Sequence, residues 1–146
     1  MIVTFFLLLQ MACPDHADHA MGFSQATSKH TFRLYSDGGA IEVRGDDAAT
    51  VKAIRAHLQM IAREFAAGDF AHPEAVHDQK PDGAATMKKL RRDINYEYAE
   101  IDSGGRVRIT TKNRRALDAI HQFLRFQIRE HKTGDTDHIS DPASSR

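Results

Sequence analysis

The spacing of apolar residues changes several times between residues 31 and 131. Phe32 and Leu34 alternate with polar residues before Asp37-Gly38-Gly39, and the alternation resumes after this turn with Ile41 and Val43. Such a pattern predicts two antiparallel strands joined by a tight turn. The following apolar positions recur at intervals of three and four, which predicts an amphipathic helix that ends near Gly68. These helix positions are Val51, Ile54, Leu58, Ile61 and Phe65.

The same order of two strands and a helix recurs later in the chain at a constant offset. Residues 38–69 align without a gap on residues 104–135, and nine positions are identical. In the second copy Ser103-Gly104-Gly105 supplies the turn and Asn113 is suited to begin the helix. The apolar stripe of this helix is Leu117, Ile120, Leu124 and Ile128. A gapless match across turn, strand and helix indicates an internal duplication.

These two ββα units predict an α+β fold. A lone hairpin is marginally stable and an amphipathic helix must bury its stripe, so we expect both hairpins to form a four-stranded antiparallel sheet. Both helices should cover one face of this sheet, and a pseudo-twofold should relate the units. The single domain is predicted to span residues 21–133, with repeat 1 at about 31–69, a loop-rich insertion at 70–93 and repeat 2 at about 94–133. The polar residues 134–146 predict a disordered tail.

The pattern of residues 1–20 predicts an export signal followed by a linker. Residues 2–9 are apolar except for Thr4, which is the length of a signal-peptide core and too short for a membrane-spanning helix, although no Lys or Arg precedes them. Cys13 follows Met11-Ala12, where a bacterial lipoprotein would carry its lipid, and loss of Cys13 with the signal is an equal alternative. The following residues to position 20 are polar and predict a flexible, histidine-containing linker. We therefore expect a periplasmic or lipid-anchored protein, with membrane contact only through a lipid at Cys13.

Composition narrows the choice of partners and chemistry. Twenty Lys and Arg residues balance twenty Asp and Glu residues, which argues against a dedicated nucleic-acid partner. A single cysteine excludes an internal disulfide and any metal site built from cysteines alone. No G-x-S-x-G, P-loop, G-x-G-x-x-G or H-E-x-x-H motif is present, so we assign no catalytic residue.

Histidine and methionine are the candidate ligands, since the chain has nine His and five Met residues. Imidazole suits copper and zinc, while thioether sulfur selects Cu(I), so the combination favours a copper ion. His57 and Met60 are three positions apart on the first predicted helix and share a face, and the loop histidines His72 and His77 can reach this helix and complete a site. Core packing is the alternative for this helical pair, because the second copy has Phe123 and Phe126 there. The candidate metal ligands are His57, Met60, His72 and His77.

Several segments resemble a known family. They are Met21-Gly22-Phe23, the stretch from Thr31-Phe32 to Asp37-Gly38-Gly39, Gly68-Asp69-Phe70, and residues 123–135. Over roughly residues 21–135 the chain is similar to small exported bacterial proteins of unknown activity that often carry the label aspartate carbamoyltransferase. That label implies carbamoyl transfer, although His72-Pro73-Glu74-Ala75 departs from the His-Pro-x-Gln motif of that enzyme and no Ser-Thr-Arg-Thr loop is present.

Three functional hypotheses follow from the sequence. The first is an exported small protein that binds a soft metal such as copper through His and Met. The second is a protein interaction or dimerisation module, a homodimer for example, in which the histidines are structural. Carbamoyltransferase-type activity is the third.

Overall fold

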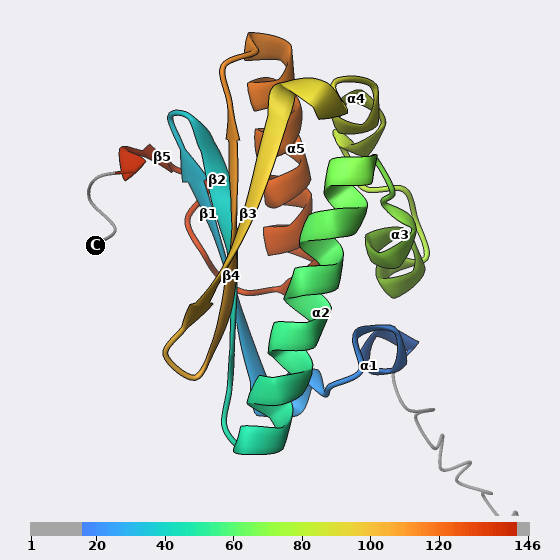
Figure 1. Cartoon of the computed structure of the whole chain (residues 1–146). Helices are drawn as coiled ribbons and strands as arrows, with labels where there is room; N and C mark the ends of the chain where they lie inside the picture. The colour runs from blue at the N-terminus through green and yellow to red at the C-terminus, as the bar shows by residue number, and fades with distance from the viewer. Residues whose placement is uncertain (1–15, 143–146) are drawn as a thin grey trace, which may run out of the picture.

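The computed structural model describes residues 16–142. The chain forms an α+β fold in which one five-stranded sheet, ordered β3-β4-β2-β1-β5, has the helices on one side (Figure 1). The strands are β1 (Ser28–Tyr35), β2 (Gly38–Gly45), β3 (Ile94–Ile101), β4 (Gly104–Thr111) and β5 (Ile139–Ser140). The helices are α1 (His16–Met21), α2 (Ala48–Ala67), α3 (Ala71–His77), α4 (Ala84–Lys89) and α5 (Arg114–His131), with short 3₁₀ turns η1 (Gln25–Thr27) and η2 (Arg91–Asp93). The predicted export signal and Cys13 lie outside the described residues.

Both predicted hairpins are present, and the alignment of the two repeats holds for their boundaries. β1 and β2 pair antiparallel, as do β3 and β4, and β2 pairs antiparallel with β4 at the centre of the sheet. At the offset of the repeat, β1 aligns with β3 and β2 aligns with β4. The aligned strands begin and end at equivalent positions. Asp47 and Asn113, which the repeat also aligns, cap the N-termini of α2 and α5 with their side chains. The local signals for strand, turn and helix start therefore act in the same way in both halves.

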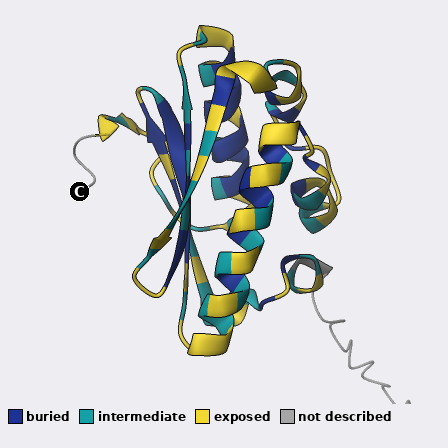
Figure 2. Cartoon of the chain, in the orientation of Figure 1, coloured by how far each residue is buried: buried dark blue, intermediate teal, exposed yellow. Residues whose placement is uncertain are grey.

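Each long helix packs on the hairpin of the other unit. α2 lies mainly over β3 and β4 and also contacts β2, whereas α5 lies mainly over β1 and β2 and also contacts β4. Glycines permit this close approach, because a Cβ on Gly39 would clash with the side chain of Leu124 and a Cβ on Gly105 would lie 3.0 Å from Leu58 Cδ1. The buried residues line the seam between sheet and helices, where much of β2 and the inner sides of α2 and α5 are dark blue in Figure 2.

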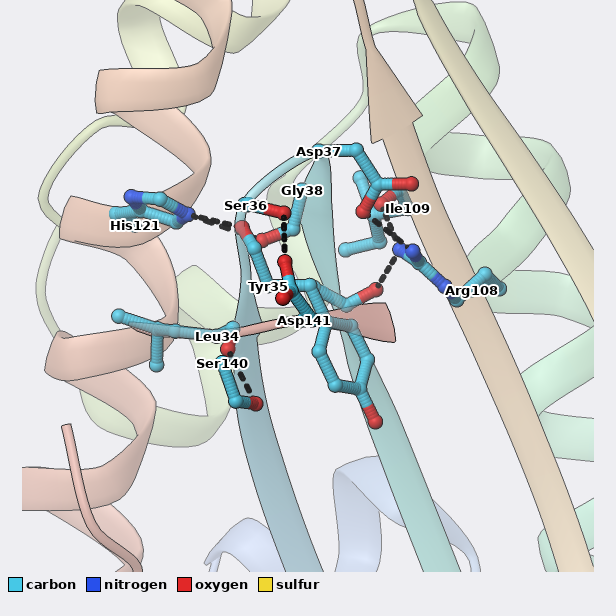
Figure 3. Close-up of polar contacts among 11 residues, drawn as sticks. Leu34, Tyr35, Ser36, Asp37, Gly38, Arg108, Ile109, His121, Ser140 and Asp141 are labelled. Carbon is cyan, nitrogen blue, oxygen red and sulfur yellow. Dashed lines mark hydrogen bonds and ion pairs between the residues drawn. The ribbon is translucent and has the colours of Figure 1, made fainter. Parts of the chain in front are cut away.

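The two hairpin turns are held by helix side chains at equivalent positions. His121 of α5 donates its Nε2 hydrogen to the carbonyls of Tyr35 and Gly38, at 2.9 and 3.0 Å (Figure 3). At the aligned position of α2, Arg55 donates to the carbonyls of Gly104 and Ile101, at 3.1 and 3.4 Å. The same type of contact thus occurs in both halves, made by an imidazole in one half and by a guanidinium in the other.

The C-terminal segment differs from the prediction of a disordered tail. β5 pairs parallel with β1, so the sheet has a fifth strand and is mixed rather than purely antiparallel. The Asp135 carboxylate accepts from the Phe32 N–H at 2.9 Å, and the Ser140 carbonyl accepts from the Ser36 N–H at 3.0 Å. β1 would otherwise be an edge strand with unpaired backbone groups. A polar segment can satisfy these groups through its own backbone, which side-chain hydrophobicity does not reveal.

Two further segments are more ordered than the sequence suggests. Residues 16–20, predicted as part of a flexible linker, belong to α1, where the Asp18 carboxylate accepts from Ser24 Oγ at 2.8 Å and from the Gln25 N–H at 3.0 Å. The insertion contains α3 as well as α4, and both lie on the side of α2 and α5 that faces away from the sheet (Figure 1). Within residues 16–142, no helix combines the length and apolar character needed to cross a bilayer.

Candidate functional site: a histidine-lined cavity

Three aromatic side chains fill one end of the seam between α2 and α5. Phe65 of α2 and Phe123 of α5 meet edge to face with ring centroids 5.5 Å apart. Tyr96 of β3 lies 5.9 Å from Phe65 in a similar arrangement. Both phenylalanines are almost fully buried. We call Phe65, Tyr96 and Phe123 the aromatic trio; its edge-to-face contacts are the arrangement that aromatic rings favour in a protein core.

Histidines occupy all three equivalent positions at the other end of the seam. The repeat aligns Phe65 with His131, Tyr96 with His30 and Phe123 with His57. We call these three histidines the histidine trio. His30 of β1 and His131 of α5 stack with centroids 4.6 Å apart, which corresponds to the contact between Tyr96 and Phe65. The repeat therefore relates a cluster of two phenylalanines and a tyrosine to a cluster of three histidines.

The histidine trio lines a cavity of about 60 Å³ together with two histidines from α3. His72 lies 6.0 Å from His57 between ring centroids, and His77 lies 4.8 Å from His131. Most of the remaining wall is apolar. The other lining residues are Met21, Phe32, Ile41, Val43, Leu58, Ile61, Phe65, Pro73, Val76, Phe123 and Gln127. Five of the nine histidines in the chain thus meet at one place.

The trio is neutral near pH 7. Burial, followed by the charge of the nearby His77, lowers the pKa of His30 from 6.5 to about 4. Burial, followed by the charges of His72 and His30, lowers the pKa of His57 to about 4. The pKa of His131 falls to about 3 through burial and then through His30 and His77. A neutral imidazole keeps a lone pair on one ring nitrogen, which is the form that binds metal ions.

Hydrogen bonds fix the two histidines of α3. His72 Nδ1 lies 2.7 Å from Glu64 Oε2, and since a carboxylate accepts, Nδ1 carries the hydrogen and Nε2 the lone pair of the neutral ring. His77 Nε2 lies 3.0 Å from Gln127 Oε1 and donates to it. Two buried polar atoms of the cavity wall, His57 Nδ1 and Gln127 Nε2, have no hydrogen-bond partner in the structure. Buried polar atoms are usually paired, so these two indicate a place where a ligand can be bound.

The predicted ligands are only partly brought together. His57, His72 and His77 line the cavity, whereas Met60 is not among its lining residues. The methionine at the cavity is Met21 of α1, which is 5% exposed. Across residues 16–142, no three side chains of His, Cys, Asp or Glu converge closely enough to hold a metal ion as they stand. Binding an ion therefore requires imidazole rings to turn toward the cavity centre.

Three residues of the cavity, His30, His131 and Met21, were not among the ligands predicted from the sequence. A signal for the two histidines was present in the repeat, because the offset that pairs His57 with Phe123 also pairs His131 with Phe65 and His30 with Tyr96. No comparable signal exists for Met21, which precedes the repeat. No protein-family model, curated protein or solved structure matches this chain.

Proposed function

We propose that this chain is an exported metal-binding protein that holds Cu(I) in the histidine-lined cavity. The observation that carries the proposal is the replacement of the whole aromatic trio by three neutral histidines at the equivalent end of the seam. A core position gains nothing in packing from an imidazole whose nitrogen is left without a partner, as His57 Nδ1 is. Imidazole lone pairs in an apolar cavity are instead suited to a metal ion.

The donor set favours Cu(I) over Zn²⁺. Met21 lines the same cavity as His57 and His30, and thioether ligands select soft Cu(I). The cavity is small and largely apolar, so a monovalent ion loses less hydration free energy on entry than a divalent ion does. His30, His57 and His131 are the proposed nitrogen ligands, and Met21 is the proposed sulfur ligand.

Competition between the full-length protein and a Cu(I) chelator tests this function. We expect one Cu(I) per chain, and X-ray absorption should show nitrogen and sulfur neighbours. The triple variant His30→Tyr, His57→Phe, His131→Phe carries at each site the residue of the equivalent position and should fold while losing Cu(I). The double variant His19→Ala, His138→Ala removes two exposed histidines and serves as the control that should retain binding.

Three results would contradict parts of this function. If the triple variant folds and binds Cu(I) as tightly as the wild type, the cavity is not the site. If the wild type binds Zn²⁺ more tightly than Cu(I), the choice of metal is wrong. A wild-type chain that takes up neither ion would overturn metal binding and favour the alternative of an interaction module with structural histidines.

A further inference from the structure

The insertion helix α3 places two histidines against the cavity, and their hydrogen-bond partners differ in charge. His72 contacts the Glu64 carboxylate and His77 contacts the Gln127 amide. Glu64 lies on α2, two turns beyond His57 of the trio. The side chains of Glu64 and His72 are 25% and 30% exposed, so the pair is partly shielded from water. One of the two histidines is thus coupled to a negative charge, and the other to a neutral group.

A carboxylate behind a histidine changes what the ring can do as a ligand. The hydrogen bond to Glu64 orients the His72 ring and fixes the tautomer that leaves the lone pair on Nε2. It also supplies a negative charge near a cavity whose trio of histidines is neutral, which offsets the cost of placing a cation there. The His72 ring is 6.0 Å from the ring of His57, whose Nδ1 is buried without a partner. The two rings therefore border the same space.

We propose that His72 is a further Cu(I) ligand, bound through Nε2, and that Glu64 is its positioning residue. This inference rests on the proposed function, because it adds a ligand to the same site. This inference assigns a role to the insertion, which belongs to neither repeat. Its helix α3 brings an imidazole that is paired with a carboxylate to a cavity lined by residues of both repeats. His77 lacks the carboxylate and serves as the internal comparison.

Glu64→Gln tests the inference in the full-length protein. The variant keeps an acceptor oxygen for His72 but removes the negative charge. The free energy of unfolding should therefore change little, whereas the Kd for Cu(I) should rise at least about tenfold. Loss of a hydrogen-bond partner behind a metal-binding histidine has an effect of this order in other metal sites. Glu74→Gln removes an exposed carboxylate of α3 itself and is the matched control, which should leave the Kd unchanged.

A double-mutant cycle separates positioning from a merely structural role. His72→Ala should weaken Cu(I) binding, and Glu64→Gln should add almost nothing in that background if Glu64 acts through His72. Nitrogen-15 NMR of the metal-free protein should show His72 as the Nδ1–H tautomer, with this preference reduced in Glu64→Gln.

Each outcome identifies which idea fails. Wild-type binding of Cu(I) with an unchanged Kd in Glu64→Gln overturns the inference and leaves the proposed function standing. An equal loss from Glu64→Gln with and without His72 shows that the carboxylate does not act through that ring, which also overturns it. If the wild type binds no Cu(I), the proposed function fails and the inference fails with it.

Discussion

The two ends of the α2–α5 seam have the same backbone and opposite chemistry. At one end Phe65, Tyr96 and Phe123 fill the space with edge-to-face ring contacts. At the other end the histidine trio occupies the equivalent positions and borders a cavity of about 60 Å³. One more equivalent pair on this seam, Ile61 and Gln127, shows the same change from apolar to polar. The aromatic side chains therefore pack as core, whereas the histidines bring lone pairs to a cavity that Phe65 and Phe123 also line.

The contrast shows which parts of the repeat the fold requires. Helix caps, hairpin turns and the glycine-to-leucine contacts keep their roles in both halves. The side chains along the seam are free to differ, because one well-packed aromatic cluster already joins the helices and the sheet. A second cluster at the other end is not needed for the architecture, so polar groups can be placed there at a limited cost in stability.

The largest expected difference between the two ends is in the cost of truncation. Phe123→Ala should lower the free energy of unfolding by about 3–5 kcal/mol, since it leaves a void among buried rings. Its counterpart His57→Ala should cost less than about 2 kcal/mol, because it also removes a buried nitrogen without a partner. Denaturant unfolding of both variants checks the order, and a larger loss from His57→Ala would contradict the contrast.

Acidification should weaken the histidine end selectively. Above pH 6.5 the folded and unfolded chains both carry neutral imidazoles, so the trio contributes no pH dependence. As the pH falls from 6.5 toward about 4, the unfolded chain binds protons that the partly buried His30 and His57 of the folded chain do not, and the free energy of unfolding decreases. The loss for one such histidine is on the order of 2–3 kcal/mol.

Unfolding curves between pH 7 and pH 4 measure this effect. The variant His30→Tyr, His57→Phe, His131→Phe should show a much flatter pH dependence over that range. A slope equal to that of the wild type would mean that other groups cause the acid sensitivity.

A smaller effect is expected when the histidine end is made more like the aromatic end. His57→Phe replaces an imidazole that has an unpaired buried nitrogen with the residue of the equivalent position, and should stabilise the metal-free chain by about 1 kcal/mol. Thermal unfolding would show a raised midpoint. A destabilised variant would indicate that the cavity is too narrow for a phenyl ring or that His57 has a bound partner in solution.

The smallest change should come from Gln127→Ile, which copies Ile61. The substitution removes a buried Nε2 without a partner but also breaks the 3.0 Å hydrogen bond to His77. These contributions oppose each other, so stability should change by less than about 1 kcal/mol. Exchange of the His77 ring hydrogen, followed by NMR, should accelerate even though the unfolding midpoint hardly moves.

The residues of the candidate site differ in how far sequence patterns could identify them. Helical spacing predicts His57, and a place in the loop-rich insertion between the repeats predicts His72 and His77; all three line the cavity. The same spacing predicts Met60 as a ligand beside His57, whereas Met21 and not Met60 lines the cavity. Spacing on one helix describes a face but not what is packed against that face, so it could not distinguish these two methionines.

The local elements follow from the order of amino acids alone: two hairpins with glycine turns, two capped amphipathic helices and the offset between them. Periodicity and turn chemistry specify them, and both act over a few neighbouring residues. Packing in three dimensions was needed to establish that α2 covers the hairpin of the other unit, that β5 joins β1, and that His30, His57 and His131 meet. Such contacts join residues far apart in the chain, and they depend on how whole faces pack and which backbone groups remain to be paired.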